Sequence, residues 1–336
     1  MKSSAIVFAG KGHVEVIEEE VGPPSPDTLL IETEKTLIST GTETTCLDRR
    51  FEEGTGWDAW VKYPFRPGYS NVGAVVEVGA GVVAFAPGDR VFTRAGHAQY
   101  VTFPAGGAVR VPDAVDSESA SWAGLGKIVQ NGVRRAEHTL GDAVVVAGLG
   151  PLGQLAVQYV NLMGPRELIA IDTVQARLDL AAQHGATHGL CKPAGECVDA
   201  VRELTKGAMA DVVYDMTGNA AVLSQVLGLA RPLGKVVLVG DTGYPSAQHL
   251  SQFLVTGGLT LVGAHDSNPA PETSIHTPWS HTSITELFLH YLTRGRMEVK
   301  TLTTHRFPFE QAVAAYGLLR ENRADTMGVI LDWQKD

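Results

Sequence analysis

The chain has 336 residues, of which 44% are hydrophobic and 19% are charged, and its formal net charge is −10. This length predicts more than one folded core in an α/β protein, and the negative charge disfavours nucleic acids and anionic membranes as partners. No apolar run of about eighteen residues and no signal-like N-terminus occur, so neither a membrane span nor export is predicted. The three cysteines, Cys46, Cys191 and Cys197, lack CxxC spacing. They indicate no disulfide framework or metal-binding knuckle, and a reducing cytoplasm is expected.

The first third of the chain is predicted to be β-rich. Its apolar residues alternate in short stretches, and glycine and proline turns such as Pro87-Gly88-Asp89 separate them. The predicted strands span 4–8, 13–17, 28–37, 72–78, 89–93 and 98–103. Many short strands between such turns are typical of a partly closed barrel.

The periodicity changes near Ser117. Residues 118–137 have a helical pattern, after which predicted strands and helices alternate. They span 143–147, 152–163, 167–172, 176–184, 196–205, 211–215, 220–230, 234–239, 248–256 and 260–264. This alternation predicts a doubly wound parallel sheet. Helices are expected over 282–294 and 309–321 and a strand over 326–332, so residues 1–122 and 267–336 are predicted to form one domain and residues 123–266 a nucleotide-binding domain.

A glycine-rich turn joins the first predicted strand of that sheet to its helix. Gly148 is expected to allow the sharp turn, Gly150 the approach of a pyrophosphate, and Gly153 the close packing of helix on strand. Pro151 and Leu152 begin the helix, whose N-terminus supplies N–H donors and partial positive charge to phosphates. The flanking strands and helix favour a dinucleotide site over a glycine-rich surface loop.

The strand that follows ends on Asp172, which is placed to accept hydrogen bonds from the adenosine ribose. Its carboxylate would repel the 2′-phosphate of NADPH, so NAD(H) is the preferred cofactor. Arg177 could bind that phosphate, so NADP(H) remains possible. Ligands bind beyond the carboxyl ends of such strands. The remaining predicted cofactor contacts are Thr173, Thr217, Gly240, Asp241, Ala264 and His265, although turn formation by Gly240 and loop capping by His265 are open alternatives.

Nearly the whole chain resembles the medium-chain dehydrogenase/reductase superfamily, which includes the zinc alcohol dehydrogenases. The matching pieces are Thr40-Gly41-Thr42-Glu43, Pro67-Gly68-Tyr69-Ser70-Asn71-Val72-Gly73, Val78-Gly79, Pro87-Gly88-Asp89-Arg90-Val91, Gly141-Asp142 and Gly185-Ala186. The resemblance implies a GroES-like catalytic domain and a Rossmann domain. It also implies a homodimer that pairs through the edge strand 259–264.

The chain departs from this resemblance at the positions of the zinc ligands. Zinc-binding members carry cysteine and histidine ligands where this chain has Thr40 and Tyr69, and their third ligand falls at Ala123 or Gly124. The lobe with four cysteines is also missing. Catalytic zinc needs three protein ligands, so no zinc is expected. Within the superfamily, Ser39–Glu43, the Pro67-Gly68-Tyr69 segment and the tail look most like the branch of bacteriochlorophyllide dehydrogenases.

Without zinc, protein groups must polarise the substrate oxygen and handle its proton. Lys127, near the expected nicotinamide, and Tyr69, in place of the histidine ligand, are the candidate proton donors, with Thr42 and Thr40 as secondary donors. The alternatives are that Lys127 is a surface lysine in an ordinary ion pair, that Tyr69 only lines the cleft, and that the threonines bond local backbone. The insert 48–62, with two tryptophans, and the segment 267–279 are candidate lids or packing segments.

These observations predict a zinc-independent, NAD(H)-dependent alcohol dehydrogenase or ketone reductase that acts on a small-molecule substrate. Ring-bearing, sugar-like and tetrapyrrole hydroxyethyl alcohols are the expected substrate types. Two alternatives are an NADPH-dependent quinone or enoyl reductase and a non-catalytic NAD(H)-binding protein. A carboxylate at Asp172 argues against the first, and the hydroxyls of Thr42 and Tyr69 argue against the second.

Overall fold

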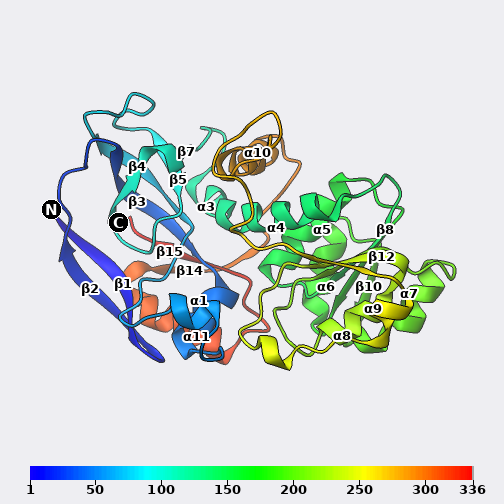
Figure 1. Ribbon diagram of the computed structural model, residues 1–336. Coiled ribbons are helices and arrows are strands. Elements are labelled where there is room, and N and C mark those ends of the chain that lie inside the picture. The colour runs from blue at the N-terminus through cyan, green and yellow to red at the C-terminus, as the bar shows by residue number, and fades with distance from the viewer. Residues whose placement is uncertain (335–336) are drawn as a thin grey trace. The chain divides into compact units, whose positions relative to one another are not determined.

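The computed structural model describes residues 1–334 and divides the chain into two compact units (Figure 1). One unit comprises Met1–Leu125 and Ala270–Asp336, and the other comprises Gly126–Pro269. Both boundaries lie three residues later than the positions expected from the sequence. No helix in the described part of the chain is long and apolar enough to cross a bilayer.

The strands of the first unit pair in antiparallel fashion, except for the parallel pair Thr303–Pro308 and Gly328–Asp332. Strands β1 (Lys2–Gly10) and β2 (His13–Glu20) form a hairpin, and the larger sheet has the order β14-β15-β3-β4-β5-β7, with β6 paired to β3. The bounds are β3 (Thr28–Ile38), β4 (Asn71–Val78), β5 (Arg90–Thr93), β6 (Tyr100–Pro104), β7 (Val109–Arg110), β14 (Thr303–Pro308) and β15 (Gly328–Asp332). Its helices are α1 (Thr40–Asp48), α2 (Gly56–Trp60), α3 (Ser117–Ala120), α10 (His281–Thr293) and α11 (Ala312–Glu321). The C-terminal segment therefore belongs to the first unit.

A buried aromatic core joins early and late parts of this unit. Phe8 of β1 makes an edge-to-face contact with Tyr316 of α11, with ring centroids 5.1 Å apart. Phe309 stacks on Trp333 at 4.6 Å, and each of these four side chains is less than 5% exposed. Such contacts fix α11 and the last strand against the N-terminal hairpin.

The second unit is a doubly wound sheet of six parallel strands, in the order β10-β9-β8-β11-β12-β13. The strands are β8 (Ala143–Ala147), β9 (Glu167–Asp172), β10 (His188–Cys191), β11 (Ala210–Asp215), β12 (Ala230–Leu238) and β13 (Thr260–Gly263). The helices are α4 (Ala123–Ala136, which begins in the first unit), α5 (Pro151–Leu162), α6 (Gln175–Gln183), α7 (Val198–Leu204), α8 (Leu223–Val226) and α9 (Gln252–Thr256). The strand order reverses between β8 and β11, where such folds bind their ligands.

The predicted fold class is confirmed, and one predicted helix needs correction. The helix expected over 118–137 is two helices, α3 and α4, separated by Ser121 and Trp122. Helix α1 and strand β10 were not predicted. The sequence of β10, His-Gly-Leu-Cys, has one large apolar residue and lies at the sheet edge.

Candidate active site

In the first unit, the start of α1 brings three hydroxyl groups together. Ser39 is the N-cap residue of α1, Thr42 lies in its first turn, and Tyr69 comes just before β4. The Tyr69 hydroxyl donates a hydrogen bond to Ser39 Oγ and lies 3.4 Å from Thr42 Oγ1. The sequence indicates Tyr69 and Thr42 as candidates but not Ser39. We call Ser39, Thr42 and Tyr69 the hydroxyl cluster.

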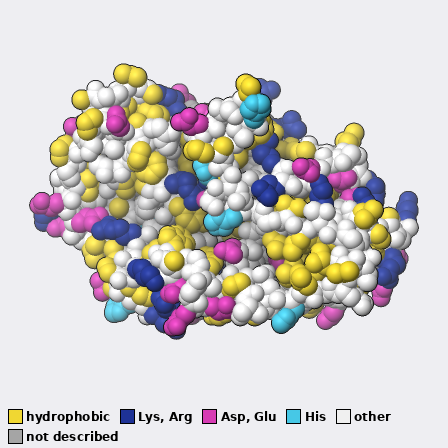
Figure 2. Space-filling model, viewed as in Figure 1, with side chains coloured by type: hydrophobic (Ala, Val, Ile, Leu, Met, Phe, Trp, Pro, Cys, Tyr) yellow, Lys and Arg dark blue, Asp and Glu magenta, His cyan; other side chains and the backbone are white. Residues whose placement is uncertain are grey.

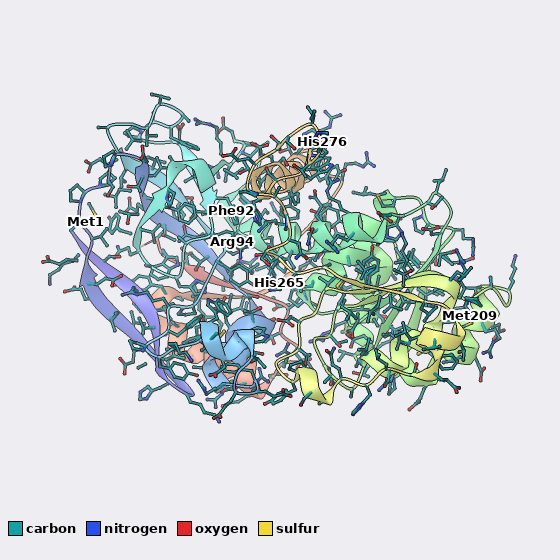
Figure 3. All side chains as sticks on the ribbon, viewed as in Figure 1. Met1, Phe92, Arg94, Met209, His265 and His276 are labelled. Atoms are coloured by element: carbon teal, nitrogen blue, oxygen red, sulfur yellow. The ribbon has the colours of Figure 1, made fainter. Side chains whose placement is uncertain are left out.

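Tyr69 is held as a neutral phenol. Burial raises the pKa of Tyr69 to about 12, and the negative charge of Glu43 acts in the same direction. The hydrogen bonds to Ser39 and Thr42 and the charge of Arg94 oppose this rise. Arg94, labelled in Figure 3, places its guanidinium carbon 4.8 Å from the centre of the Tyr69 ring. Tyr69 therefore keeps its proton through the physiological pH range and can donate it in a hydrogen bond.

Thr40 occupies the first position of α1. It is 5% exposed, and its carbonyl accepts a hydrogen bond of 2.6 Å from the Thr44 hydroxyl. This contact uses the Thr40 carbonyl and not its hydroxyl, so the alternative in which the hydroxyl bonds local backbone also stays open. Its role as a secondary donor remains a prediction.

In the second unit, Lys127 lies in α4 and is buried. Its side chain is 2% exposed, and its Nζ atom lies 2.8 Å from Oδ1 of Asp266. The alternative of a surface lysine is therefore wrong, although Lys127 does take part in an ion pair. The Asp266 carboxylate stabilises a positive charge at this place. Asp266 was not predicted as a site residue, and its only signal in the sequence is its position shortly after β13, the last strand of the parallel sheet.

The glycine turn has the conformations expected from the sequence. Gly148 has φ of +88°, in the left-handed region that glycine favours. A Cβ atom on Gly153 would lie 1.9 Å from the Gly148 carbonyl oxygen, so helix and turn pack too closely for any side chain. Gly150 caps α5, and a Cβ atom there would meet nothing within 4 Å. Helix α5 then begins with Pro151 and Leu152, so its N-terminus faces open space beside Gly150.

Asp172 fastens this turn through its carboxylate. Its Oδ2 accepts a 2.7 Å hydrogen bond from the Leu149 N–H, and its Oδ1 accepts a 2.9 Å bond from the Val174 N–H. Arg177 Nη1 lies 3.8 Å from Oδ2. Each carboxylate oxygen keeps further acceptor capacity. Asp172 is therefore both a structural anchor and an available acceptor, while the neighbouring Thr173 is exposed.

The other predicted cofactor contacts lie at the ends of β11, β12 and β13. The Thr217 hydroxyl donates to Oδ1 of Asp215 at 2.6 Å, and burial raises the pKa of that carboxyl. A Cβ atom on Gly240 would lie 2.3 Å from the Gly218 nitrogen, so close packing requires this glycine. Beside it, Asp241 is exposed.

The end of β13 is bonded locally. The buried Ala264 donates its N–H to the Leu238 carbonyl at 2.9 Å. His265 is exposed (Figure 3), and its Nδ1 lies 2.8 Å from Ser267 Oγ. The His265 carbonyl accepts a 2.9 Å bond from Asn131. These bonds match the alternative in which His265 caps its loop.

The positions that the family resemblance assigns to zinc ligands do not fit a zinc ion. Tyr69 joins the start of α1 through hydrogen bonds, and a Cβ atom on Gly124 would lie 2.0 Å from Ser70 Oγ. These positions lie within the first unit, but they carry threonine, tyrosine and either alanine or glycine instead of nitrogen, sulfur or carboxylate ligands. Within residues 1–334, no group of three His, Cys, Asp or Glu side chains is arranged to hold a metal.

Comparison with known proteins places the chain in a family. Residues 26–113 match the alcohol dehydrogenase GroES-like domain, and residues 151–274 match the zinc-binding dehydrogenase domain. The L-threonine 3-dehydrogenase of Bacillus licheniformis is 27% identical over 314 residues, which cover 82% of this chain and 85% of the relative.

Solved structures share the fold. A putative zinc-binding dehydrogenase from Sinorhizobium meliloti 1021 bound to NADP has a TM-score of 0.81 and 20% identity, and covers 99% of each chain. The short chain alcohol dehydrogenase rspB from Escherichia coli CFT073, complexed with NADH, has a TM-score of 0.81 and 20% identity, and covers 98% of this chain and 99% of the other. With both domain models matched in order, the chain belongs to the zinc-type alcohol dehydrogenase-like family of oxidoreductases.

Proposed function

We propose that this protein is a zinc-independent oxidoreductase that transfers hydride between NAD(H) and a secondary alcohol or ketone. The observation that carries the proposal is the hydroxyl cluster, which places the neutral phenol of Tyr69 at a position where zinc-binding relatives have a ligand. Hydrogen-bond donors aimed at a substrate oxygen can replace the polarising effect of a metal.

The proton chemistry follows from the bonds of Tyr69. When bound, NAD(H) would supply or accept the hydride. In ketone reduction, the Tyr69 hydroxyl donates its proton to the carbonyl oxygen and recovers one through Thr42, which is partly exposed. Alcohol oxidation runs through the same groups in reverse. Lys127 is the second candidate donor, because its ammonium group is buried and paired with Asp266.

The residues of the glycine turn fit a dinucleotide. The open space at Gly150 and the N-terminus of α5 suit the pyrophosphate. The carboxylate of Asp172 suits ribose hydroxyls and opposes a 2′-phosphate, which favours NAD(H) over NADP(H). Arg177 beside it leaves NADP(H) as the second choice.

The substrate class is the least constrained part of the proposal. The sequence resemblance to bacteriochlorophyllide dehydrogenases favours a secondary alcohol on a ring or hydroxyethyl side chain. The panel for testing therefore contains hydroxyethyl tetrapyrroles, cyclitols, sugar alcohols and the matching ketones. Reduced nicotinamide absorbance would report turnover in either direction.

Substitutions then test the proton donors. Tyr69→Phe or Lys127→Met should lower kcat/KM by about 10²-fold or more, as expected for loss of a general acid. Thr42→Val should have a smaller effect. If Tyr69→Phe and Lys127→Met both kept the original kcat/KM, the proposed chemistry would be wrong. Coenzyme binding without turnover across the panel would favour a non-catalytic NAD(H)-binding protein, and a preference for NADPH with quinones or enones would favour a quinone or enoyl reductase.

We also propose a homodimer that pairs through β13. Within residues 1–334, β13 pairs only with β12, and its Leu261 is 37% exposed. Nearby in the chain, Phe253 is 44% and Val255 is 85% exposed. Figure 2 shows hydrophobic side chains gathered where Figure 1 draws α9. An exposed apolar edge strand is suited to pairing with a second copy.

Light scattering after size exclusion tests the dimer. The original chain should have the mass of a dimer, and Leu261→Lys should have the mass of a monomer. A monomeric original chain would contradict this part of the proposal.

The cytoplasm is the proposed location, since the three described cysteines are free thiols, as in reducing compartments.

A further inference from the structure

A buried hydrogen-bond network lies behind the hydroxyl cluster. Its central members are Glu43, His97 and Tyr316, which are 1%, 2% and 0% exposed. The Glu43 Oε2 atom lies 3.0 Å from His97 Nε2 and also accepts a hydrogen bond from the Tyr316 hydroxyl. The other oxygen, Oε1, accepts a 2.7 Å bond from the backbone N–H of Ser39. One carboxylate therefore holds the N-cap residue of α1 and is itself held by two side chains.

The network continues beyond His97. Trp333 Nε1 donates a 2.9 Å hydrogen bond to Thr36 Oγ1, which in turn lies 2.8 Å from His97 Nδ1. Both ring nitrogens of His97 are therefore bonded, Nε2 to Glu43 and Nδ1 to Thr36. These bonds fix the orientation of the ring from two sides.

His97 also contacts the segment that carries Tyr69. Its backbone N–H donates to the Pro67 carbonyl at 3.1 Å. Gly68 has φ of +94°, and a Cβ atom there would lie 2.8 Å from Cδ2 of the His97 ring. The ring therefore lies directly against the residue before Tyr69. His97 therefore contacts this segment directly. It also bonds to Glu43, which in turn accepts the hydrogen bond from the Ser39 N–H.

We propose that His97 is a positioning residue, which holds the Tyr69 hydroxyl against Ser39 by bracing both segments at once. The inference rests on the proposed function, because it assigns His97 a task in the reaction of the hydroxyl cluster. His97 acts through Glu43 and through Pro67 and Gly68, and does not itself touch the substrate oxygen.

Four variants distinguish a positioning role of His97 from a purely structural one. His97→Gln keeps an amide N–H that reaches Glu43, whereas His97→Leu removes both polar contacts of the ring. His97→Asn keeps the contact with Thr36 and loses the one with Glu43, and it serves if His97→Leu does not fold. His138→Leu is the matched control, because His138 in the second unit is also buried and also bonded, with its Nε2 2.6 Å from the Tyr214 hydroxyl.

The measurement is the ionisation of Tyr69 in protein labelled with carbon-13 at the tyrosine Cζ, and the signal is identified by its loss in Tyr69→Phe. The charged groups that act on Tyr69 are Glu43 of α1 and Arg94 after β5. The hydrogen bond to Ser39 lowers the pKa of Tyr69 against the effect of burial, so its loss should move the Tyr69 titration to higher pH. In the original chain, in His97→Gln and in His138→Leu, the onset of ionisation should stay in place, whereas in His97→Leu and His97→Asn it should move to higher pH.

Turnover provides the second readout. With a substrate from the panel, His97→Leu and His97→Asn should lose about tenfold or more in kcat/KM while binding NADH as before. An unchanged Tyr69 titration in both variants would overturn the proposal. Because the titration needs neither coenzyme nor substrate, it decides the positioning role even if no alcohol on the panel is turned over, an outcome that would count against the proposed function alone.

Discussion

Two glycines of one turn offer a test in which stability and coenzyme binding should separate. At Gly153, an added Cβ atom would lie 1.9 Å from the Gly148 oxygen and 2.9 Å from the Gly148 carbonyl carbon. Both atoms belong to backbone that is already fixed, since the Gly148 N–H donates to Ile171 at 2.9 Å. Gly153→Ala must therefore push α5 away from the turn. Overpacking of this kind costs about 1–3 kcal/mol of unfolding free energy.

Gly150→Ala is the matched control in the same turn. Its φ of −66° suits any residue, and the added methyl group meets nothing within 4 Å. The free energy of unfolding should change by less than about 0.5 kcal/mol. The methyl group does occupy the open space beside the N-terminus of α5, where the pyrophosphate is proposed to lie. NADH binding should therefore weaken about tenfold or more, or about 1.4 kcal/mol.

Denaturant unfolding and calorimetric titration with NADH measure the two effects. All tryptophans lie outside Gly126–Pro269, so unfolding of this unit is better followed by far-ultraviolet circular dichroism than by fluorescence. Gly153→Ala should lower the denaturation midpoint, whereas Gly150→Ala should leave it in place. If Gly150→Ala bound NADH as tightly as the original chain, the phosphates would not lie at this turn, and the assignment of the coenzyme site would fail.

Three further predictions concern charged and titratable groups. Lys127→Met should destabilise the second unit by more than about 1 kcal/mol because it removes the buried ammonium that pairs with Asp266, and Lys127→Met with Asp266→Asn should recover part of that loss in a double-mutant unfolding cycle. Asp172→Asn keeps one of the two acceptors for the turn and removes the negative charge, so the ratio of kcat/KM with NADPH to that with NADH should rise about tenfold; an unchanged ratio would count against Asp172 as the selector. In the folded protein, burial lowers the pKa of His138 below its ordinary value of 6.5. The unfolded chain therefore binds a proton at this side chain more readily than the folded chain does. The free energy of unfolding falls as the pH drops from 6.5 through the lower pKa of the folded state. Between pH 7.5 and pH 5.5, the Tm of His138→Gln should accordingly fall less than the Tm of the original chain. An equal fall would show that His138 does not determine the pH dependence of stability in this range.

The Rossmann unit could be predicted because its strands have a strong local signal. A parallel strand with both faces covered is a continuous apolar run, as in 143–147, where every residue is buried. The glycine turn also depends on local sequence, since Gly153 packs against Gly148 within one short segment of the chain. By contrast, β10 exposes alternate residues at the sheet edge and has no such run.

Helix α1 could not be predicted, and the hydroxyl cluster depends on it. Its sequence TGTETTCLD is rich in β-branched threonine and has no amphipathic pattern, and threonine is a weak helix former. The helix is held by tertiary contacts instead. Glu43 bonds to His97 and to Tyr316, which are 54 and 273 residues away in the chain. The sequence could indicate Tyr69 and Thr42 as chemistry-bearing residues, but nothing local indicated that Ser39, His97 and Tyr316 hold them.

The packing around the positions that the resemblance assigns to zinc ligands predicts the outcome of building a metal site there. Thr40→Cys with Tyr69→His would supply two ligand side chains and would remove the phenol from the hydroxyl cluster. The third ligand would come from Ala123, which is 0% exposed, or from Gly124, where even a Cβ atom would lie 2.0 Å from Ser70 Oγ and 3.1 Å from the Tyr69 carbonyl oxygen. Two ligands do not make a tight catalytic zinc site, and a third at Gly124 needs a shift of α4 or of the Tyr69 segment, which His97 contacts. The contacts that are proposed to position Tyr69 would therefore oppose an engineered zinc site.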